Sequence, residues 1–318
     1  MRIAVIDDWQ GIAETSADWS WLRDHGDPVF FNRAFASEDE AASQLVDFDI
    51  ILAMRERTAF PASLVERLPR LRMFSLTGKR GATLDLDAMA RRGITVCYTE
   101  GSGDGAGTAE LALALMLAAA RNVVGGDTAV RSGAFQQGVL PGMELSGRTL
   151  GLIGLGRLGS RMARYGAALG MDCVAWSPNL DAARAAASGA AYVEKDELLA
   201  RSDVVSLHIV LSQSTRGLIG QRELALMKDG AILVNTSRGP LVDEAALIAA
   251  LRRGRLTAAL DVYDREPLPQ GHPLTTLPNT VLTPHLGYAT REVMGEFYKQ
   301  LAENARAFIE GNPVRVLS

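Results

Sequence analysis

Short runs of β-branched and apolar residues alternate with amphipathic helical stretches along most of this chain of 318 residues. Strands that alternate with helices form βαβ units, and βαβ units build parallel sheets. The strands expected in a first sheet are residues 2–7, 49–54, 72–77 and 94–99, and those expected in a second sheet are residues 149–154, 172–176, 203–208, 231–236, 256–262 and 280–285. The pattern therefore predicts an α/β fold with two parallel sheets.

The length of the chain predicts more than one domain. A chain of 318 residues exceeds the size at which a single hydrophobic core stops growing. The glycine-rich stretch EGSGDGAGTAE lies between the two sets of strands, and its Thr108 can cap the long helix that follows. A last helix, after the second set of strands, cannot complete that sheet alone. We expect a first domain of residues 1–100 plus 288–318, and a second domain of residues 101–287 inserted into it.

The composition limits the kinds of partner that we expect. A net charge of -4 and a pI near 5.7 give no electrostatic reason to expect nucleic acid or an anionic membrane, so a small molecule is the expected partner. Cys97 and Cys173 are too few and too far apart for a disulfide framework or a zinc site, and no metal is expected. The apolar start is too short for a signal peptide, and the most apolar helix is shorter than the ~18 residues that span a bilayer. The expected location is cytoplasmic.

The stretch TLGLIGLGRLGS contains Gly154, Gly156 and Gly159 in a GxGxxG pattern. The pattern alone is weak in a chain with 31 glycines, but here it follows an apolar strand and opens a helix, which is the context that dinucleotide binding requires. Gly154 would permit a tight turn, Gly156 would let the backbone approach a pyrophosphate, and Gly159 would let helix and strand pack closely. The stretch predicts a Rossmann-like domain that binds a dinucleotide.

The next strand ends in Trp176, Ser177, Pro178 and Asn179 rather than in an acid. A carboxylate at this point, roughly 20 residues after the glycines, holds the ribose hydroxyls of NAD and repels a 2'-phosphate. The first basic residue further along is Arg184, so the sequence shows no obvious phosphate clamp either. NAD is the expected cofactor, and NADP stays open.

A GxGxxG near residue 150 implies that the cofactor domain is inserted into another domain. That arrangement resembles the D-isomer-specific 2-hydroxyacid dehydrogenase family, which includes phosphoglycerate dehydrogenases. The segments that carry the resemblance are GLIGLGRLG (151–159), SLHIVLSQSTRGLIG (206–220), VNTSRGPLVDEAAL (234–247), ALDVYDREPL (259–268) and TPHLGYAT (283–290). The resemblance implies two Rossmann-like or flavodoxin-like domains, with the NAD(P)-binding domain inserted into the substrate domain. It also implies an NAD(P)-dependent oxidoreductase that interconverts 2-oxo acids and D-2-hydroxy acids.

By this resemblance Arg238 is the catalytic arginine, Glu266 is the acid paired with histidine, and His285 is the proton donor. A guanidinium can grip a substrate carboxylate and polarise the neighbouring carbonyl. An imidazolium can protonate the carbonyl oxygen as hydride arrives, and a carboxylate at its other nitrogen would fix its tautomer. On composition alone Arg238 is more often a surface turn residue than a catalytic one, Glu266 more often a cap, and His285 more often a core histidine. Their positions after the ends of successive strands favour catalysis.

The resemblance also assigns binding residues. Those expected to contact the cofactor are Gly154, Gly156, Arg157, Leu158, Gly159, Ser177, Ile209, Thr236, Asp261, Gly287 and Thr108. Asp261 would contact the nicotinamide carboxamide, with a structural hydrogen bond as the alternative, and His208 is expected to be structural. Those expected to bind the substrate are Gly78, Lys79, Arg80 and Arg55. The loop LTGKRGAT departs from the family's Gly-x-Gly turn, so the geometry of this loop and the substrate stay open.

The long helix after Gly107 is apolar over much of its circumference, and members of the family are dimers through this region, so a homodimer is expected. Two alternatives remain. One is an NADP-linked glyoxylate or hydroxypyruvate reductase, which has the same chemistry with a narrower substrate. The other is a dinucleotide-sensing protein related to transcriptional co-repressors, which share the fold and the Arg, Glu and His constellation.

Overall fold

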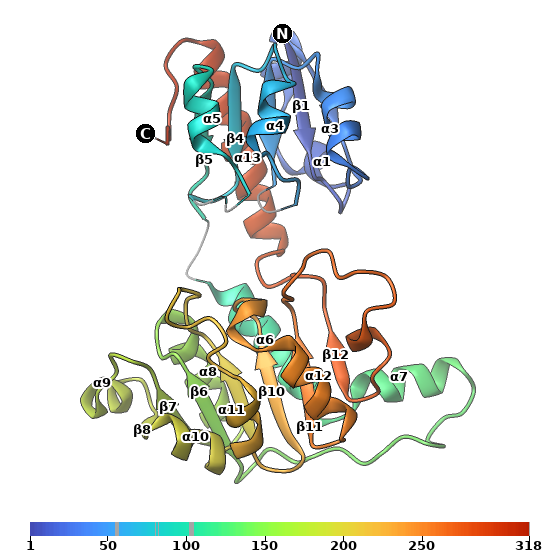
Figure 1. Ribbon diagram of the computed structural model, residues 1–318, viewed down its shortest axis with the longest axis vertical. Helices are drawn as coiled ribbons and strands as arrows, with labels where there is room; N and C mark the ends of the chain where they lie inside the picture. Colours follow the sequence, from blue (N-terminus) through green and yellow to red (C-terminus); the bar gives the residue numbers. More distant parts are fainter. Residues whose placement is uncertain (55–56, 80, 82, 102–104, 318) are drawn as a thin grey trace. The chain divides into compact units, whose positions relative to one another are not determined.

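The computed structural model describes residues 1–54, 57–79, 81, 83–101 and 105–317 of the chain (Figure 1). It divides into two compact units, which we call unit 1 (Met1–Gly103 with Thr290–Ser318) and unit 2 (Asp104–Ala289). Each unit contains one sheet, and every strand pair in both sheets is parallel. The prediction of an α/β fold with two parallel sheets is confirmed.

Unit 1 contains a five-stranded sheet in the order β2-β1-β3-β4-β5. Its strands are β1 (Arg2–Ile6), β2 (Asp27–Phe30), β3 (Ile50–Ala53), β4 (Met73–Leu76) and β5 (Thr95–Tyr98). The inner strands are covered on both faces, and all four residues of β3 and of β4 are buried. Burial on both faces explains why these strands appear in the sequence as unbroken apolar runs.

The helices of unit 1 are α1 (Ala13–Ser16), α2 (Ser20–His25), α3 (Glu38–Leu45), α4 (Ala62–Glu66), α5 (Leu86–Arg91) and α13 (Arg291–Ile309). Although α13 comes from the far end of the sequence, it packs on β3, β4 and β5. Buried polar contacts fix it there, because Asn304 Nδ2 donates to Ser75 Oγ at 2.9 Å and Tyr298 Oη donates to Asp8 Oδ1 at 3.0 Å. The last helix therefore completes the core of unit 1.

Unit 2 contains a seven-stranded sheet in the order β12-β11-β10-β9-β6-β7-β8. Its strands are β6 (Thr149–Ile153), β7 (Asp172–Trp176), β8 (Ala191–Tyr192), β9 (Val204–Leu207), β10 (Ala231–Asn235), β11 (Leu256–Leu260) and β12 (Thr280–Leu282). Because the strands are parallel, all their carboxyl ends lie at one edge of the sheet, which we call the carboxyl edge. Loops at this edge can bring side chains from different strands together.

The helices of unit 2 form a layer on each face of its sheet. They are α6 (Ala106–Ala120), α7 (Val123–Arg131), α8 (Arg157–Ala168), α9 (Ala182–Ala187), α10 (Lys195–Arg201), α11 (Gln221–Leu226) and α12 (Glu244–Arg252). In β9, Val204 belongs to the apolar cluster that includes α6 and α8, and the adjacent Val205 belongs to the cluster that includes α10, α11 and α12. This alternation is the two-residue period of a strand with both faces buried.

The start of α6 differs from the prediction. The helix begins at Ala106, and its N-cap is Gly105 in a left-handed conformation with φ of 80°. The expectation that Thr108 caps this helix is therefore wrong. Thr108 lies inside the first turn, where its hydroxyl donates to the carbonyl oxygen of Gly287 at 2.8 Å. Gly105 displaces Thr108 from the cap position because glycine adopts positive φ without a steric penalty.

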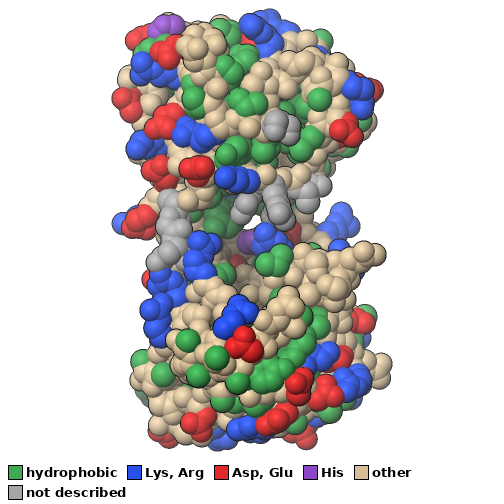
Figure 2. Space-filling view, turned by 90° about the vertical axis from the view of Figure 1, so that its left-hand side faces the viewer, with side chains coloured by type: hydrophobic (Ala, Val, Ile, Leu, Met, Phe, Trp, Pro, Cys, Tyr) green, Lys and Arg blue, Asp and Glu red, His purple; other side chains and the backbone are tan. Residues whose placement is uncertain are grey.

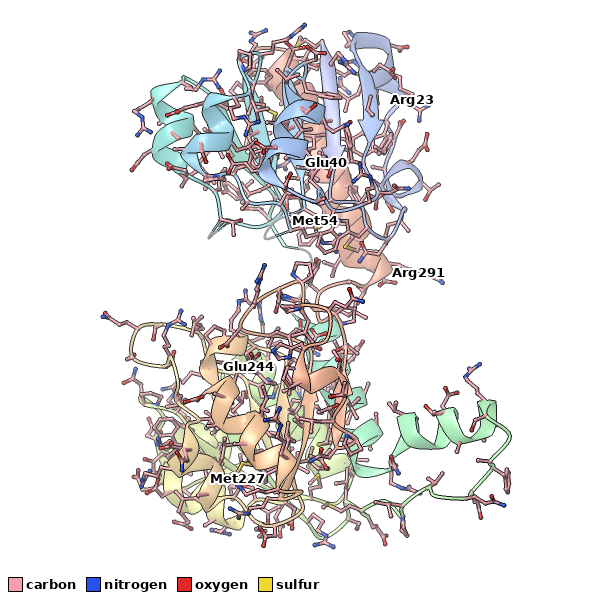
Figure 3. All side chains as sticks on the ribbon, turned by 45° about the vertical axis from the view of Figure 1, so that its right-hand side comes forward. Arg23, Glu40, Met54, Met227, Glu244 and Arg291 are labelled. Atoms are coloured by element: carbon pink, nitrogen blue, oxygen red, sulfur yellow. The ribbon has the colours of Figure 1, made fainter. Side chains whose placement is uncertain are left out.

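Acidic and basic side chains are interspersed on each unit in the face shown in Figure 2. In unit 2, α7 and the segment after it extend away from the sheet (Figures 1 and 3). Exposed large apolar side chains of this segment are Val123, Val124, Val130, Phe135 and Leu140. In the part of the chain that the structure describes, no single helix is long and apolar enough to cross a membrane, although α6 and α7 together, bent by 65°, pass by length and composition.

Candidate active site

The glycine-rich turn of unit 2 joins β6 to α8. Gly154 has φ of 96°, and a Cβ at this position would lie 2.6 Å from the carbonyl carbon of His208. A Cβ on Gly159 would lie 2.1 Å from the carbonyl oxygen of Gly154. No atom lies within 4 Å of a Cβ on Gly156. Gly154 and Gly159 therefore have no room for a side chain. The backbone at Gly156 is uncovered, as the approach of a pyrophosphate would require.

Two buried polar atoms, His208 Nδ1 and Thr236 Oγ1, have no hydrogen-bond partner among the described residues. His208 follows β9 and Thr236 follows β10, so both lie at the carboxyl edge. The Oγ of Ser206 lies 2.9 Å from His208 Nε2, and burial lowers the pKa of the His208 imidazole to about 4, so the ring is neutral. Buried polar atoms without partners are rare in folded proteins. Together with the open face of Gly156, they fit a dinucleotide at this edge.

The other residues expected to bind the cofactor also lie near the carboxyl edge. Arg157 and Leu158 begin α8, and Leu158 reaches the start of α6, where a Cβ on Gly105 would lie 2.6 Å from its Cδ2. Ser177 follows β7, and Ile209 follows His208 after β9. The expected contacts of these residues with a cofactor stay predictions.

His285 follows β12 and adopts a left-handed conformation with φ of 55°. Its Nδ1 lies 2.5 Å from Glu266 Oε2, and Glu266 follows the neighbouring strand β11. Its backbone N–H donates to the carbonyl oxygen of Asp261 at 2.9 Å. A positive φ is uncommon for residues other than glycine, and here surrounding hydrogen bonds hold it. The pairing of His285 with Glu266 leaves Nε2 as the ring nitrogen that can exchange a proton with a ligand.

The fully buried carboxylate of Asp261 organises the loop after β12, which contains His285. Its Oδ1 accepts hydrogen bonds from Thr283 Oγ1 at 2.6 Å and from the backbone N–H of Leu286 at 2.7 Å. Its Oδ2 accepts from the backbone N–H of Gly287 at 2.9 Å. Burial raises the pKa of Asp261, and these hydrogen bonds oppose the rise. In this structure Asp261 makes the structural hydrogen bonds named as the alternative, and the nicotinamide contact stays a prediction.

Tyr263 connects the loops after β11 and β12. Its backbone N–H donates to Glu266 Oε1 at 2.9 Å, so each carboxylate oxygen of Glu266 has a partner. The Tyr263 hydroxyl donates to the carbonyl oxygen of Thr283 at 2.9 Å. Burial, with the nearby Asp261 and Glu266 carboxylates, raises the pKa of the Tyr263 phenol, which keeps it protonated as a donor. Glu266 and His285 are therefore held from both loops.

Arg238 lies in the loop after β10, and Asn235 shapes this loop. The Asn235 amide donates to the carbonyl oxygen of Arg238 at 2.9 Å, and its Oδ1 accepts from the backbone N–H of Ser237 at 3.0 Å. Gly239 permits the loop to lie against the next one, because a Cβ at Gly239 would lie 2.0 Å from the carbonyl carbon of Tyr263. The half-buried Arg238 side chain donates from Nη1 to the Ser237 carbonyl at 2.7 Å. These contacts hold the loop after β10, which contains Arg238 (the arginine loop), against the loop after β11, which contains Tyr263 and Glu266 (the Tyr263–Glu266 loop).

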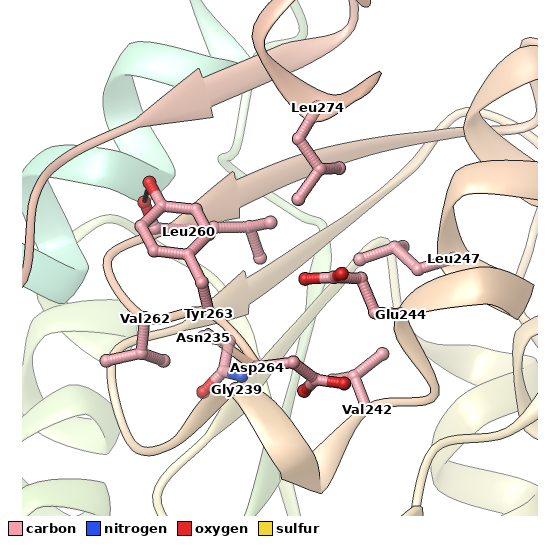
Figure 4. Close-up of a pocket in the computed structure, with 10 residues that line it drawn as sticks. All are labelled: Asn235, Gly239, Val242, Glu244, Leu247, Leu260, Val262, Tyr263, Asp264 and Leu274. Atoms are coloured by element: carbon pink, nitrogen blue, oxygen red, sulfur yellow. Dashed lines mark hydrogen bonds between the residues drawn. The ribbon is translucent and has the colours of Figure 1, made fainter. Parts of the chain in front are cut away.

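A small pocket borders these loops, lined in part by Tyr263, Asp264 and Glu244 (Figure 4). The Nε2 of His272 lies 3.1 Å from Glu244 Oε1. Burial and the nearby Glu244 raise the pKa of Asp264, while Arg216 opposes the rise. The pocket has room for about one water molecule, so it is not a substrate site.

The loop expected to bind the substrate lies in unit 1. Gly78 has φ of 76°, and its backbone N–H donates to Thr99 Oγ1 at 3.0 Å, so this donor already has a partner. Lys79 Nζ lies 3.7 Å from Glu100 Oε1 and 5.0 Å from the centre of the Tyr98 ring. Arg55 and Arg80 lie outside the described residues.

Among the described residues, no group of three or more His, Cys, Asp or Glu side chains could hold a metal ion. Cys97 and Cys173 are free. Burial raises the pKa of the Cys97 thiol to about 11 and also raises the pKa of Cys173, which keeps both thiols protonated and poorly nucleophilic.

Residues 113–287, more than half of the chain, match the model of the NAD-binding domain of the D-isomer specific 2-hydroxyacid dehydrogenases. The chain belongs to this family. The resemblance carried by the sequence motifs is therefore confirmed, as is the assignment to a family of oxidoreductases that bind a nicotinamide cofactor.

Relatives within the D-isomer specific 2-hydroxyacid dehydrogenase family include enzymes of different names. The chain is 39% identical over 280 residues to a D-3-phosphoglycerate dehydrogenase of Archaeoglobus fulgidus, covering 88% of this chain and 53% of the relative. It is 43% identical over 256 residues to a glyoxylate reductase of Aeropyrum pernix, covering 78% of this chain and 76% of the relative. The crystal structure of a phosphoglycerate oxidoreductase from Vibrio cholerae is 34% identical, with a TM-score of 0.91 over 98% of this chain and 99% of that one. The chain spans about half the length of the Archaeoglobus enzyme.

Three residues at the carboxyl edge have structural roles that the sequence motifs do not indicate. They are Asn235, Gly239 and Tyr263. Asn235 could have been found from the sequence, because an asparagine at the end of a strand commonly bonds to the backbone two residues further along. The close approach at Gly239 and the double role of Tyr263 depend on contacts between two loops, which local sequence does not reveal.

Proposed function

We propose that this protein is an NAD(P)-dependent oxidoreductase that interconverts a 2-oxo acid and a D-2-hydroxy acid. The observation that carries the proposal is the hydrogen-bonded pair of His285 and Glu266, with Arg238 in a loop packed against the same strand ends. The three residues follow β12, β11 and β10, which are neighbours in the sheet that also carries the glycine-rich turn. Ligands of open α/β sheets bind at this edge.

The residues of the chain supply the proton and the charge for the reaction. In the reduction, His285 donates its Nε2 proton to the carbonyl oxygen of the 2-oxo acid, while Glu266 stabilises the imidazolium through Nδ1. Arg238 binds the substrate carboxylate with its planar guanidinium and polarises the carbonyl. When it is bound, the nicotinamide supplies the hydride. The oxidation runs the same steps in reverse, with neutral His285 as the base.

The cofactor would lie across the glycine-rich turn, with its pyrophosphate over Gly156 and the start of α8. Thr236 Oγ1 and His208 Nδ1 are unpartnered in the described structure and are available to this ligand or to its ordered water. Gly78, Lys79, Arg80 and Arg55 stay the residues that the sequence predicts for binding the substrate carboxylate. The names of the relatives favour a small 2-oxo acid such as glyoxylate, or a phosphorylated acid.

We further propose a homodimer formed through the α6–α7 region. The segment that extends from unit 2 exposes apolar side chains, and Phe135 is 71% exposed. A groove beside it is lined by the end of α6 and by residues 277–282. Apolar surface of this kind is typical of an interface between subunits. The dimer is tested by light scattering after gel filtration, and Phe135→Asp should shift the mass toward the monomer. The cytoplasmic location stays a prediction.

The experiment that tests the activity is a turnover screen of the purified protein with NADH and NADPH against pyruvate, glyoxylate, hydroxypyruvate and bulkier 2-oxo acids. At least one should be reduced, and Arg238→Ala should abolish its reduction while leaving cofactor binding nearly intact. Arg201→Ala, which removes an arginine paired with Glu197 at the other edge of the sheet, serves as the matched control. Cofactor binding without turnover on any 2-oxo acid would contradict the enzyme and support a dinucleotide sensor.

A further inference from the structure

The turn after β7 brings a distant arginine back to the end of the strand. The backbone N–H of Leu180 donates to the carbonyl oxygen of Ser177 at 3.1 Å and closes the turn. Arg184 lies in the first turn of α9, and its Nη1 donates to the carbonyl oxygen of Asn179 at 2.6 Å. Arg184 is seven positions after Ser177 in the sequence, but its guanidinium lies on the turn that Ser177 begins.

This turn is next to the glycine-rich turn. The strands β6 and β7 pair up to Ile153 and Trp176, and the backbone N–H of Gly154 donates to the Trp176 carbonyl at 2.8 Å. The end of α9 also contacts the start of α8, where Ser160 Oγ donates to Ser188 Oγ at 3.2 Å. The Arg184 guanidinium is therefore held at the carboxyl edge beside the proposed pyrophosphate site, where an adenosine ribose would lie.

The charge at this point favours an anion. No acid ends β7, and the nearest acid along the chain, Asp181, caps α9 by accepting from the backbone N–H of Arg184 at 2.8 Å. In the part of the chain that the structure describes, Arg184 forms no ion pair, and its side chain is exposed. The bond to Asn179 uses one of the five N–H donors of the guanidinium. The remaining donors can serve a ligand.

We propose that Arg184, together with the hydroxyl of Ser177, binds the 2'-phosphate of NADP, and that the protein binds NADPH at least as tightly as NADH. A guanidinium matches phosphate oxygens with paired hydrogen bonds, and its attachment to Asn179 reduces the freedom lost on binding. The neutral Ser177 does not repel the phosphate as a carboxylate would. The inference rests on the proposed function only in requiring a dinucleotide at the glycine-rich turn.

Binding measurements test this without reference to turnover. Fluorescence titrations would give dissociation constants for NADPH, NADH, 2',5'-ADP and 5'-ADP. In Arg184→Gln, affinity for NADPH and 2',5'-ADP should fall by about tenfold to a hundredfold, as expected for a charge-assisted hydrogen bond, while affinity for NADH and 5'-ADP stays within about twofold. Arg201→Gln removes an equal charge at the amino edge of the sheet, just before β9, and should change none of the four.

The pH dependence of binding and a second variant test the same proposal. Because the second proton of a phosphate monoester binds near pH ~6, NADPH affinity should fall below that pH and NADH affinity should not. Arg184→Lys should retain part of the NADPH affinity. A parent protein that binds NADH tenfold more tightly than NADPH, or an Arg184→Gln variant that weakens both equally, would overturn the inference.

The outcome also separates this inference from the proposed function. Reduction of 2-oxo acids with NADH but not NADPH would leave the proposed function standing and refute the role of Arg184. Tight binding of 2',5'-ADP that depends on Arg184, without reduction of any 2-oxo acid, would support the role of Arg184 and refute the proposed function.

Discussion

His285 Nδ1 lies 2.5 Å from Glu266 Oε2, and the other carboxylate oxygen of Glu266 accepts from the backbone N–H of Tyr263. The carboxylate is thus fixed at one end by its own loop and presents the other end to the imidazole. Because Nδ1 is bonded to the carboxylate, Nε2 is the ring nitrogen left to exchange a proton with a ligand.

Replacing Glu266 should lower the rate of reduction. Glu266→Gln keeps the shape of the side chain and removes the carboxylate that bonds to His285 Nδ1. The imidazole then loses the partner that fixes its tautomer and orientation, so kcat for reduction should fall by about tenfold to a hundredfold. Steady-state rates of the two proteins measure this loss. Equal rates would show that the pair does not act in catalysis.

Replacing His285 should remove most of the rate at every pH. His285→Gln should lower kcat by a factor on the order of 10² to 10⁴, the usual contribution of a general acid. Cofactor affinity, measured by fluorescence titration, should change little because the Asp261 carboxylate still holds the backbone of the loop. A variant that keeps the parental rate would make His285 a structural residue.

Gly239→Ala should impair catalysis without adding or removing a functional group. The new Cβ would lie 2.0 Å from the carbonyl carbon of Tyr263, so the arginine loop and the Tyr263–Glu266 loop must separate. A displacement of about 1 Å can lower a rate by about 10²-fold, and we expect at least that loss in kcat. Gly220→Ala is the control, because its Cβ would meet nothing closer than 3.5 Å. Equal activity of the two variants would contradict the packing described here.

Ser177→Asp should shift cofactor preference toward NADH. A carboxylate after β7 can bind the ribose hydroxyls and repels a 2'-phosphate, so the ratio of NADH to NADPH affinity should rise by about tenfold or more. Ser177→Asn has the same size without the charge and should change the ratio much less. An unchanged ratio in Ser177→Asp would mean that residue 177 does not face the ribose.

The buried Asp7 should make the free energy of unfolding depend on pH. Burial raises its pKa from 3.8 to about 6, although Thr58 Oγ1 donates to it at 2.6 Å. The folded state then holds the Asp7 proton more tightly than the unfolded state, so this stabilisation is complete below pH ~3.8 and is lost as the pH rises through about 6. Relative to Asp7→Asn, the parent should lose about 1 kcal/mol of unfolding free energy between pH ~5 and ~7.5. Urea unfolding of both proteins at the two pH values measures it, and a constant difference would contradict the shift.

The inner strands were predictable because both their faces are buried, which gives continuous apolar runs. The sequence pattern does not predict β2 or β8, which lie at sheet edges. β2 contains Pro28, which an edge strand tolerates because it needs fewer backbone donors, and β8 has only two residues. The expected strands at residues 256–262 and 280–285 extend too far, because β11 ends at Leu260 and β12 ends at Leu282. The side chains of Asp261 and Thr283, which follow these ends, bond to each other in the loops.

The positions of the candidate site residues were predictable where these residues follow strand ends. The pairing of Glu266 with His285 joins residues 19 positions apart, and the parallel order of β11 and β12 explains why they meet. The return of Arg184 to Asn179 was not predictable, because it depends on the turn and the helix between them. The same holds for Thr108, since the conformation of Gly105 decides where α6 starts.

The hydrogen bond from Thr108 to the carbonyl oxygen of Gly287 fastens the first turn of unit 2 to nearly its last residues. When the two ends of a segment lie close together, inserting the segment into a host loop costs little entropy. A short linker can also join the two ends. We therefore expect unit 2 to tolerate circular permutation with a short linker between its present ends.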